Sequence, residues 1–250
     1  HTITSVNILA ALHATLTGLL TDLWNEGDTS TQVAAVDLLI RGLTQADPVS
    51  SQRRQLLTEQ RNQARFDLIA SLVDLHRVAL TYVTNKKGGD VVLDALQAVS
   101  RETHQYDALP ADELKLDLIS GGVDMEGIER VMRAAERSRT ASGDFVPLGE
   151  SLRNIVATSA ISHGVDVDRF NAMIFAGIPS NIAEYIQASS RVGRTHVGFS
   201  LLVPTPQSRR DRYVVETHTA FHRFLERMIS PPAIDRWAAH AVKRVMPSLF

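Results

Sequence analysis

The chain has 250 residues, 44% of them hydrophobic and 22% charged, which is the composition of a globular protein long enough to bury a large core. A net charge of −2 argues against a protein that coats nucleic acid, and the absence of cysteine excludes disulfides and thiolate metal sites. Residues 1–25 do not form a signal peptide and no window is apolar enough to span a membrane, so we expect a cytoplasmic protein without a membrane partner.

Charge is distributed unevenly along the chain. Residues 181–250 contain 10 basic and 5 acidic residues, whereas residues 1–180 contain 16 basic and 23 acidic residues. A local phosphate-binding face near the C-terminal end is one interpretation, and an ordinary solvated surface is the other. The chain begins with His1 rather than methionine, which indicates a piece of a longer protein.

The N-terminal part predicts helices. Apolar residues recur at helical spacing between Val6 and Leu23 and again between Val33 and Leu43. A third helix is expected from Gln52 to Leu75, with Ser50 or Ser51 as its cap. The side chains expected to face inward from it are Leu56, Leu57, Ala64, Leu68, Leu72 and Leu75. Residues 1–76 therefore predict a helical region that packs on a neighbouring domain.

From residue 78 onward, short apolar runs alternate with helical patterns. The runs are rich in strand formers and lack the alternation of half-exposed strands. Expected strands cover residues 78–83, 114–119, 155–158, 172–175 and 199–203, expected helices cover 90–102, 125–137 and 181–190, and a polar loop covers 138–150. This order predicts an α/β domain over residues 77–206, with a parallel sheet covered by helices on both faces, and a helical tail over residues 207–250. Ligands of such sheets bind at the carboxyl ends of the strands.

The strongest chemical signal is the segment Gln187-Ala-Ser-Ser-Arg191-Val-Gly193-Arg194, which lies between an expected helix and an expected strand. Guanidinium groups hold phosphate oxygens through paired hydrogen bonds and keep their charge, and glycine allows the backbone to turn closely. Two solvated surface arginines are the alternative interpretation.

A second segment follows the strand that ends near Thr158. It passes through small and hydroxyl-bearing residues, including Ser159, and ends in Gly164-x-Asp166. Hydroxyl and main-chain N–H groups at a strand end bind phosphates, and a carboxylate accepts hydrogen bonds from sugar hydroxyls. By itself, Gly-x-Asp is typical of a turn.

Together and in this order, the two segments resemble motifs V and VI of superfamily 2 helicases. The residues that match motif VI, Gln-x-x-Gly-Arg-x-Gly-Arg, are Gln187, Arg191, Gly193 and Arg194. The residues that match motif V, which runs from Ala-Thr to Gly-x-Asp, are Ala157, Thr158, Gly164 and Asp166. Ser190 stands where the family usually has glycine. The resemblance covers roughly residues 78–205 and implies a RecA-like fold.

The resemblance also implies a role for each matched residue. Arg191 and Arg194 would reach the γ-phosphate of ATP held by a second motor domain, and Gln187 would help to position that catalytic site. The residues that would contact the nucleotide are Gly164, Asp166 and Gly193, and those that would contact the backbone of DNA or RNA are Thr158 and Ser159. ATP and Mg²⁺ are the implied cofactors, and an ATP-driven helicase or translocase is the implied function.

The sequence contains no P-loop, since no Gly-x-x-x-x-Gly-Lys-Ser/Thr pattern occurs in it. The resemblance places that element in an N-terminal RecA-like domain of the same protein, which is therefore an expected partner, and the chain alone is expected not to hydrolyse ATP. The alternative is a degenerate motor domain that acts as a non-enzymatic interaction scaffold. Ser190 and the acidic N-terminal part favour it, whereas the intact Arg191, Arg194 and Asp166 oppose it.

Three further stretches loosely resemble the large helicase of DISARM-type phage-defence systems. They are Asn-Lys-Lys-Gly-Gly at 85–89, Glu184-Tyr-Ile-Gln187 and the tail from Arg212 to Pro231. This resemblance implies defence-system proteins as partners. His218 and His222 stand four residues apart, a spacing that could hold a metal ion, but no third ligand is evident nearby and we expect no metal site.

Overall fold

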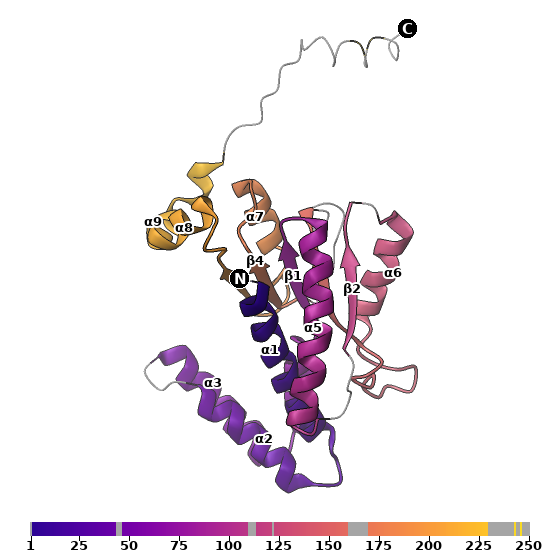
Figure 1. The fold of residues 1–250 in the computed structure, drawn as a ribbon. Coiled ribbons are helices and arrows are strands. Elements are labelled where there is room, and N and C mark those ends of the chain that lie inside the picture. Colours follow the sequence, from indigo (N-terminus) through magenta and orange to yellow (C-terminus); the bar gives the residue numbers. More distant parts are fainter. Residues whose placement is uncertain are drawn as a thin grey trace.

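The computed structural model describes residues 2–43, 47–109, 114–121, 123–159 and 170–229, together with residues 243 and 246. Its centre is a five-stranded sheet in which all neighbouring strands are parallel, in the order β2-β3-β1-β4-β5 (Figure 1). The strands are β1 (Ala79–Val83), β2 (Lys115–Ile119), β3 (Leu152–Ala157), β4 (Ala172–Ala176) and β5 (Phe199–Val203). The predicted α/β fold with a parallel sheet is therefore confirmed.

Helices cover both faces of this sheet. On one face, α1 (Thr2–Trp24) and α5 (Lys86–Tyr106) lie side by side, in front of the strands in Figure 1. On the other face, α6 (Met125–Glu136) and α7 (Ile182–Ser189) share a core that also includes Val214 and Phe221. The central strands β1 and β4 are buried throughout and need no polar alternation, which is why their sequences are largely apolar runs, whereas the outer strands β2 and β5 have exposed positions.

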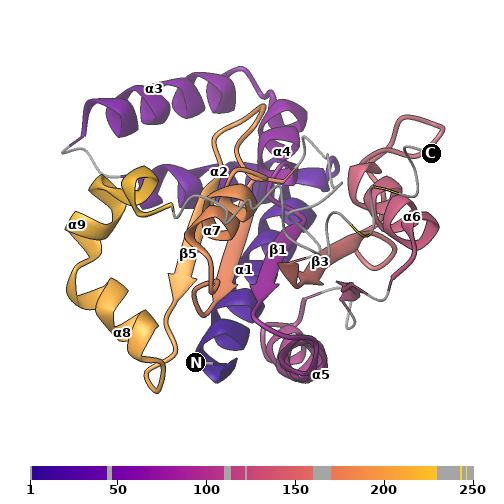
Figure 2. The same cartoon turned by 90° about the horizontal axis from the view of Figure 1, so that it is seen from above.

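The remaining helices lie at the two ends of the chain. The N-terminal ones are α2 (Thr29–Gly42), α3 (Pro48–Asn62) and α4 (Phe66–Asp74), and the C-terminal ones are α8 (Arg209–Glu216), α9 (His218–Arg223) and the 3-10 turn η2 (Leu225–Met228). The C-terminal half of α1 packs with α2 and α4 around a separate apolar cluster centred on Leu23, Val36 and Ile69. Figure 2 shows α2, α3 and α4 together at one end of the fold, with α8 and α9 beside β5. Thus α1 belongs to two cores at once.

The prediction of one long third helix is wrong. The chain forms α3 and α4 instead, because Ala64 between them adopts a left-handed conformation with φ of 53°. Asp47 rather than a serine caps α3, since its carboxylate accepts hydrogen bonds from the next N–H groups and Pro48 occupies the first helical position. Four of the side chains expected to face inward are exposed, namely Leu56, Ala64, Leu68 and Leu72.

Two other boundaries differ from the sequence prediction. β3 begins at Leu152, three residues before the expected start, because Arg153 and Asn154 are buried in the strand. α5 begins at Lys86 rather than near residue 90, because the Asn85 side chain caps it by accepting a 2.8 Å hydrogen bond from Gly88 N. The tail is helical as far as it is described, and residues 230–242 lie outside the described part of the chain.

A buried polar seam runs between α1 and the sheet. The fully buried Arg153 donates to the carbonyl of His13 at 3.2 Å and to the Thr17 hydroxyl at 3.0 Å. Nearby, Arg77 and Asp74 form a buried ion pair with an N–O distance of 3.4 Å. Burial and the Arg77 charge lower the pKa of Arg153 to about 9, so the guanidinium stays cationic at neutral pH. α1 is thus joined to β3 by charged hydrogen bonds as well as by apolar packing.

By length and composition alone, α1 is apolar enough to cross a membrane, with a mean hydropathy of 1.5 over an 18-residue window, contrary to our expectation. In the structure 56% of that window is buried inside the protein. The apolar surface of α1 is accounted for by its packing against α5, β4 and α4, as expected for a core helix.

Candidate functional site

Helix α7 runs from the carboxyl end of the sheet to its amino end, where the arginines of the motif lie. It begins at Asn181, whose side chain accepts a 2.9 Å hydrogen bond from Ala183 N, just beyond the carboxyl end of β4. Tyr185 and Ala188 face the core, and the Tyr185 ring lies 4.9 Å from that of Phe175. Gln187 is exposed on the outer side of the helix. Because α7 runs antiparallel to the strands, its last residues reach the amino-terminal end of the sheet.

The loop after α7 is attached to the residues that precede β4. Gly193 adopts a φ of +73°, which favours glycine, and its N–H donates to the Phe170 carbonyl at 2.9 Å. Phe199 N donates to the Asn171 carbonyl at 2.9 Å at the other end of the same loop. The two bonds fix residues 193–199 against the start of β4.

The end of α4 holds this loop from the outside. Asn171 Nδ2 donates to the Leu75 carbonyl at 2.9 Å. The His76 Nε2 atom lies 3.2 Å from the Val197 carbonyl oxygen, and its ring stacks on Phe199 with 6.5 Å between centroids. The conformation of the arginine loop therefore depends on helix α4 as well as on α7.

The two arginines differ in environment. Arg191 is partly buried, whereas Arg194 is exposed and its Nε donates to the Ser190 carbonyl at 3.3 Å. Glu184, the nearest acid in sequence, lies at the other end of α7 and accepts a 2.8 Å hydrogen bond from the Tyr82 hydroxyl. Burial and this hydrogen bond raise the pKa of Tyr82, so the phenol stays neutral and donates. Arg194 thus projects from a fixed loop at the protein surface.

Thr158 and Ser159 lie at the opposite end of the sheet. Thr158 directly follows β3, and its N–H donates to the Ile119 carbonyl at the end of β2 at 3.1 Å. Since a strand rises roughly 3.3 Å per residue, about 20 Å of β3 separates the two ends. Gly164 and Asp166 lie outside the described residues. The structure therefore gathers Gln187, Arg191, Gly193 and Arg194 in one place and separates them from Thr158.

A second group of polar residues, for which the sequence alone predicts no role, surrounds the carboxyl ends of β1 and β4. A pocket of about 290 Å³ lies there, lined by Thr84, Asn85, Gly88, Gly177, Thr205 and Arg210 among others. Lys86 and Lys87 are exposed in the first turn of α5, where the N–H groups of the helix also point outward. The signal for this group was present as an asparagine cap followed by two lysines directly after a strand.

Asp211 organises the loops around this pocket. It is 1% exposed, and its carboxylate accepts hydrogen bonds from Thr205 N at 2.7 Å, from the Ser208 hydroxyl at 2.8 Å and from Ile178 N at 3.2 Å. Arg210 next to it donates to the Ile178 carbonyl at 3.1 Å. The loops that follow β4 and β5 are thereby tied together at the start of α8.

The histidine pair on α9 is occupied by local contacts. His222 Nδ1 lies 2.8 Å from the His218 carbonyl oxygen, and its Nε2 lies 3.4 Å from the Tyr185 hydroxyl. Within the described residues, no group of three or more His, Asp or Glu side chains gathers around one point. Tyr185 itself is buried, so it serves packing in this fold.

Residues 78–196 match the family described as "Helicase conserved C-terminal domain", which agrees with the helicase resemblance stated from the two motifs. That segment contains β1 to β4, α7 and the arginine loop. Among curated proteins, the DISARM protein DrmA of Bacillus paralicheniformis (strain ATCC 9945a / NCIMB 11709 / CD-2) is 34% identical over 100 residues. The match covers 40% of this chain and spans only 9% of the length of that protein.

Among solved structures, helicases are similar to this chain at lower sequence identity. The DUF1998 helicase MrfA bound to DNA and AMPPNP is 16% identical, with a TM-score of 0.45 over 60% of this chain and 18% of that chain. The Mycobacterium smegmatis helicase Lhr bound to ssDNA and AMP-PNP is 18% identical, with a TM-score of 0.46 over 67% of this chain and 20% of that chain.

Gly198 is expected to be required for the shape of the arginine loop. A Cβ atom at this position would lie 2.8 Å from Gly193 N and 2.9 Å from the Asn171 carbonyl oxygen, and both are main-chain atoms that cannot turn aside. Gly198→Ala should therefore lower the free energy of unfolding by about 1–3 kcal/mol, measured by thermal and urea denaturation of the 250-residue chain. Gly42→Ala is the matched control, because nothing lies within 4 Å of a Cβ there. Equal stability of the two variants would contradict the close contact.

Proposed function

We propose that this chain is the C-terminal motor domain of an ATP-dependent nucleic-acid helicase or translocase. The observation that carries the proposal is the placement of two polar groups at opposite ends of one parallel sheet. The arginine loop lies at the amino-terminal end, and Thr158 lies with the start of α5 at the carboxyl-terminal end. A rigid sheet between them can couple a nucleotide at one end to a strand of nucleic acid at the other.

The arginine end fits the triphosphate of a nucleotide held by a second motor domain. Arg194 is exposed, and the hydrogen bonds of Gly193 and Phe199 fix the loop that carries it. A guanidinium already held in place stabilises the charge that develops on the transferred phosphoryl group without reorganising during the reaction. Gln187, exposed one turn earlier on α7, would help to position the catalytic site. The Gly193 main chain would lie against the nucleotide.

The chain by itself offers an incomplete nucleotide site. Its sequence has no P-loop, and the described residues hold no cluster of acidic side chains able to bind Mg²⁺. ATP and Mg²⁺ would therefore be bound mainly by an N-terminal RecA-like domain of the same protein, with Gly164 and Asp166 of this chain on the nucleotide. In this arrangement the chain supplies the charge-stabilising arginines and no ligand to the metal.

The carboxyl end fits the backbone of DNA or RNA. The groups around the ends of these neighbouring strands are two lysines, the first N–H groups of the 21-residue helix α5, and Thr158 and Ser159. Such groups bind phosphates irrespective of sequence. The similarity to a DISARM protein supports a phage-defence role with further defence-system proteins as partners.

A non-enzymatic scaffold is the second candidate function. The hydrogen-bonded arginine loop speaks against it, because a scaffold has no need for Gly193 in a left-handed conformation that presents Arg194 to solvent. Ser190 in place of the usual glycine does not distort the loop, since it ends α7 with an ordinary 2.9 Å bond from its N–H to the Ile186 carbonyl.

We expect the 250-residue chain to bind single-stranded DNA or RNA weakly, with a Kd of roughly 10⁻⁴ to 10⁻⁶ M at physiological salt, and without sequence preference. The logarithm of affinity should fall linearly with the logarithm of salt concentration, because each phosphate contact releases counterions. Replacing both Lys86 and Lys87 by glutamate should weaken binding and make that slope shallower by about 0.7 to 0.9 per lost contact. Fluorescence anisotropy with labelled oligonucleotides at several salt concentrations measures both quantities.

Lys115→Glu is the matched control for this experiment. Its ammonium group donates to the Glu150 carbonyl at 3.1 Å at the amino-terminal end of β2, far from the proposed nucleic-acid face. A flat salt response, a strong preference for one sequence, or an equal loss of affinity in the control would contradict the proposed face.

A further inference from the structure

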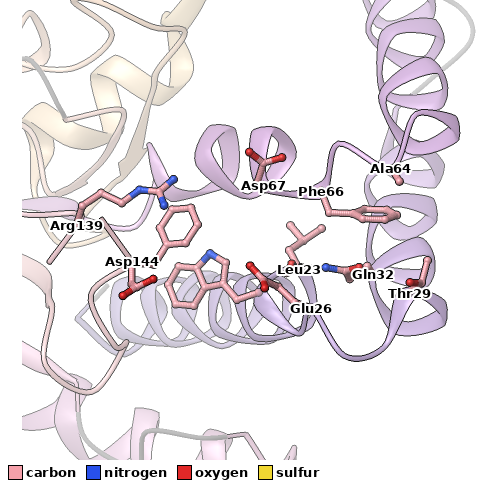
Figure 3. A pocket seen from close by; sticks show the side chains of 11 residues that line it. Leu23, Glu26, Thr29, Gln32, Ala64, Phe66, Asp67, Arg139 and Asp144 are labelled. Atoms are coloured by element: carbon pink, nitrogen blue, oxygen red, sulfur yellow. Dashed lines mark hydrogen bonds between the residues drawn. The ribbon is translucent and has the colours of Figure 1, made fainter. Parts of the chain in front are cut away.

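A pocket outside both proposed sites opens among the N-terminal helices. Its volume is about 640 Å³, and its walls come from the end of α1, the start of α2, the start of α4 and the loop at residues 139–145 (Figure 3). Figure 3 shows Asp67 and Phe66 from α4 on the side opposite Leu23 and Glu26, with Arg139 and Asp144 at one end. The arginine loop contacts the far end of α4, about one helix length away.

One wall of this pocket is aromatic and already carries a guanidinium group. The rings of Trp24 and Phe145 stack with 4.7 Å between centroids and 19° between planes. The Arg139 guanidinium lies 3.5 Å from the Phe145 ring centroid and donates to the Gly143 carbonyl at 3.0 Å and to the Ser71 hydroxyl at 3.2 Å. A planar cation over a ring face is a favourable arrangement, so this wall is suited to guanidinium groups.

The rim of the pocket has an excess of negative charge. Glu26, Asp67 and Asp144 are exposed lining residues, and Arg139 is the single basic residue in the lining. Because Arg139 is held by Phe145 and the two hydrogen bonds described above, the carboxylates outnumber the cations by two. This charge disfavours phosphate and therefore nucleic acid.

The aromatic wall also contains an unsatisfied donor. The indole Nε1 of Trp24 is buried and has no hydrogen-bond acceptor within the described part of the chain. Because this atom is covered in the unliganded pocket, the main-chain carbonyl of a bound peptide could reach it only if the Trp24 ring shifted.

From these observations we infer that the pocket binds an arginine side chain presented by a segment of a partner protein. The guanidinium group lies against the aromatic wall, and Glu26 and Asp67 accept its hydrogen bonds from opposite sides. Arginine fits better than lysine, because a planar fork both stacks on a ring and pairs with carboxylates. The inference does not depend on the proposed motor function, since it uses none of the residues of either end of the sheet.

The experiment uses the 250-residue chain with Trp237→Phe, so that Trp24 is the single fluorescent indole. The probes are the peptides acetyl-Gly-Arg-Gly-amide, acetyl-Gly-Lys-Gly-amide and acetyl-Gly-Glu-Gly-amide, and oligothymidylate. We expect the arginine peptide to change Trp24 emission with saturable, millimolar affinity, the lysine peptide to bind several-fold more weakly, and the glutamate peptide and the oligonucleotide to leave the emission unchanged.

Neutralising the rim should remove this binding. Glu26→Gln with Asp67→Asn should weaken the arginine peptide at least 10-fold, whereas Asp90→Asn with Asp94→Asn, the same charge change on exposed positions of α5, should not. Circular dichroism checks that each variant is folded, and the two single rim variants replace the double one if it is not. Absence of a saturable response to the arginine peptide, equal binding to both double variants, or stronger quenching by the oligonucleotide overturns the inference.

Discussion

Replacing Arg194 by lysine in the full-length protein is expected to slow nucleic-acid-stimulated ATP hydrolysis by about 10³-fold or more, the scale of arginine contributions in phosphoryl-transfer enzymes. Arg194→Ala and Arg191→Ala should be about as slow. Lysine keeps the charge but loses the planar fork that holds two oxygens at once, so it should not rescue the rate.

The same variants should fold normally. Arg194 is exposed, and its Nε donates a 3.3 Å hydrogen bond to the Ser190 carbonyl, at the end of a helix that Tyr185 and Ala188 anchor in the core. Exposed contacts of this length contribute little to the free energy of unfolding. The melting temperature of Arg194→Lys should therefore stay within a degree or two of wild type.

Melting temperature and ATPase rate of the full-length protein are the two readouts. Arg133→Lys is the control, because Arg133 is an exposed arginine on α6 whose contact is a 3.2 Å surface ion pair with Glu129. The isolated 250-residue chain sets the baseline, and we expect no turnover from it. Variants that melt several degrees lower but hydrolyse ATP at the normal rate would show that the arginines are structural.

The second large effect concerns pH. His13 is fully buried on α1, and burial together with the adjacent Arg153 charge lowers its pKa from 6.5 to about 3. Between these two values the unfolded chain binds a proton that the folded chain does not, so stability rises with pH in this window and falls as the solution becomes more acidic. Below pH 6.5 the free energy of unfolding should drop by about 1.4 kcal/mol per pH unit from this residue alone.

Urea denaturation at pH values between 4 and 7 measures this dependence. His13→Asn cannot take up the proton. The slope of its free energy of unfolding against pH should therefore be smaller than that of wild type by the contribution of one proton, even if the variant is less stable at every pH. His218→Asn, at an exposed position on α9, should leave the pH profile unchanged. Parallel profiles for wild type and His13→Asn would mean that His13 is not held neutral in the fold.

Much of the fold could be predicted from sequence because strands such as β1 and β4 are largely apolar runs followed by turn residues. The exceptions have local physical causes. The break between α3 and α4 depends on a left-handed alanine at position 64, with neither glycine nor proline to mark it. β3 was predicted too short because Arg153 and Asn154 resemble surface residues in sequence, whereas hydrogen bonds to α1 allow the arginine to be buried.

The candidate site was predictable where it is local. The spacing from Gln187 to Arg194 identified the arginine loop, since one helix end and one turn create it. The role of Asp211 could not be foreseen, because its partners are main-chain groups of two other loops that only the folded sheet brings together. Likewise, nothing in the sequence shows that His76 supports the loop of Gly193, which lies 117 residues further on.

The attachment of that loop to α4 has a consequence for how the position of the loop could be controlled. α4 reaches from the aromatic pocket at Phe66 to the loop at Val197, and it is buried along one side against α1. Because main-chain hydrogen bonds keep a helix straight, a tilt of α4 at the pocket would also displace its other end, at the loop. A ligand bound in the aromatic pocket would then change the position of Arg194 relative to a neighbouring domain, because α4 connects the two.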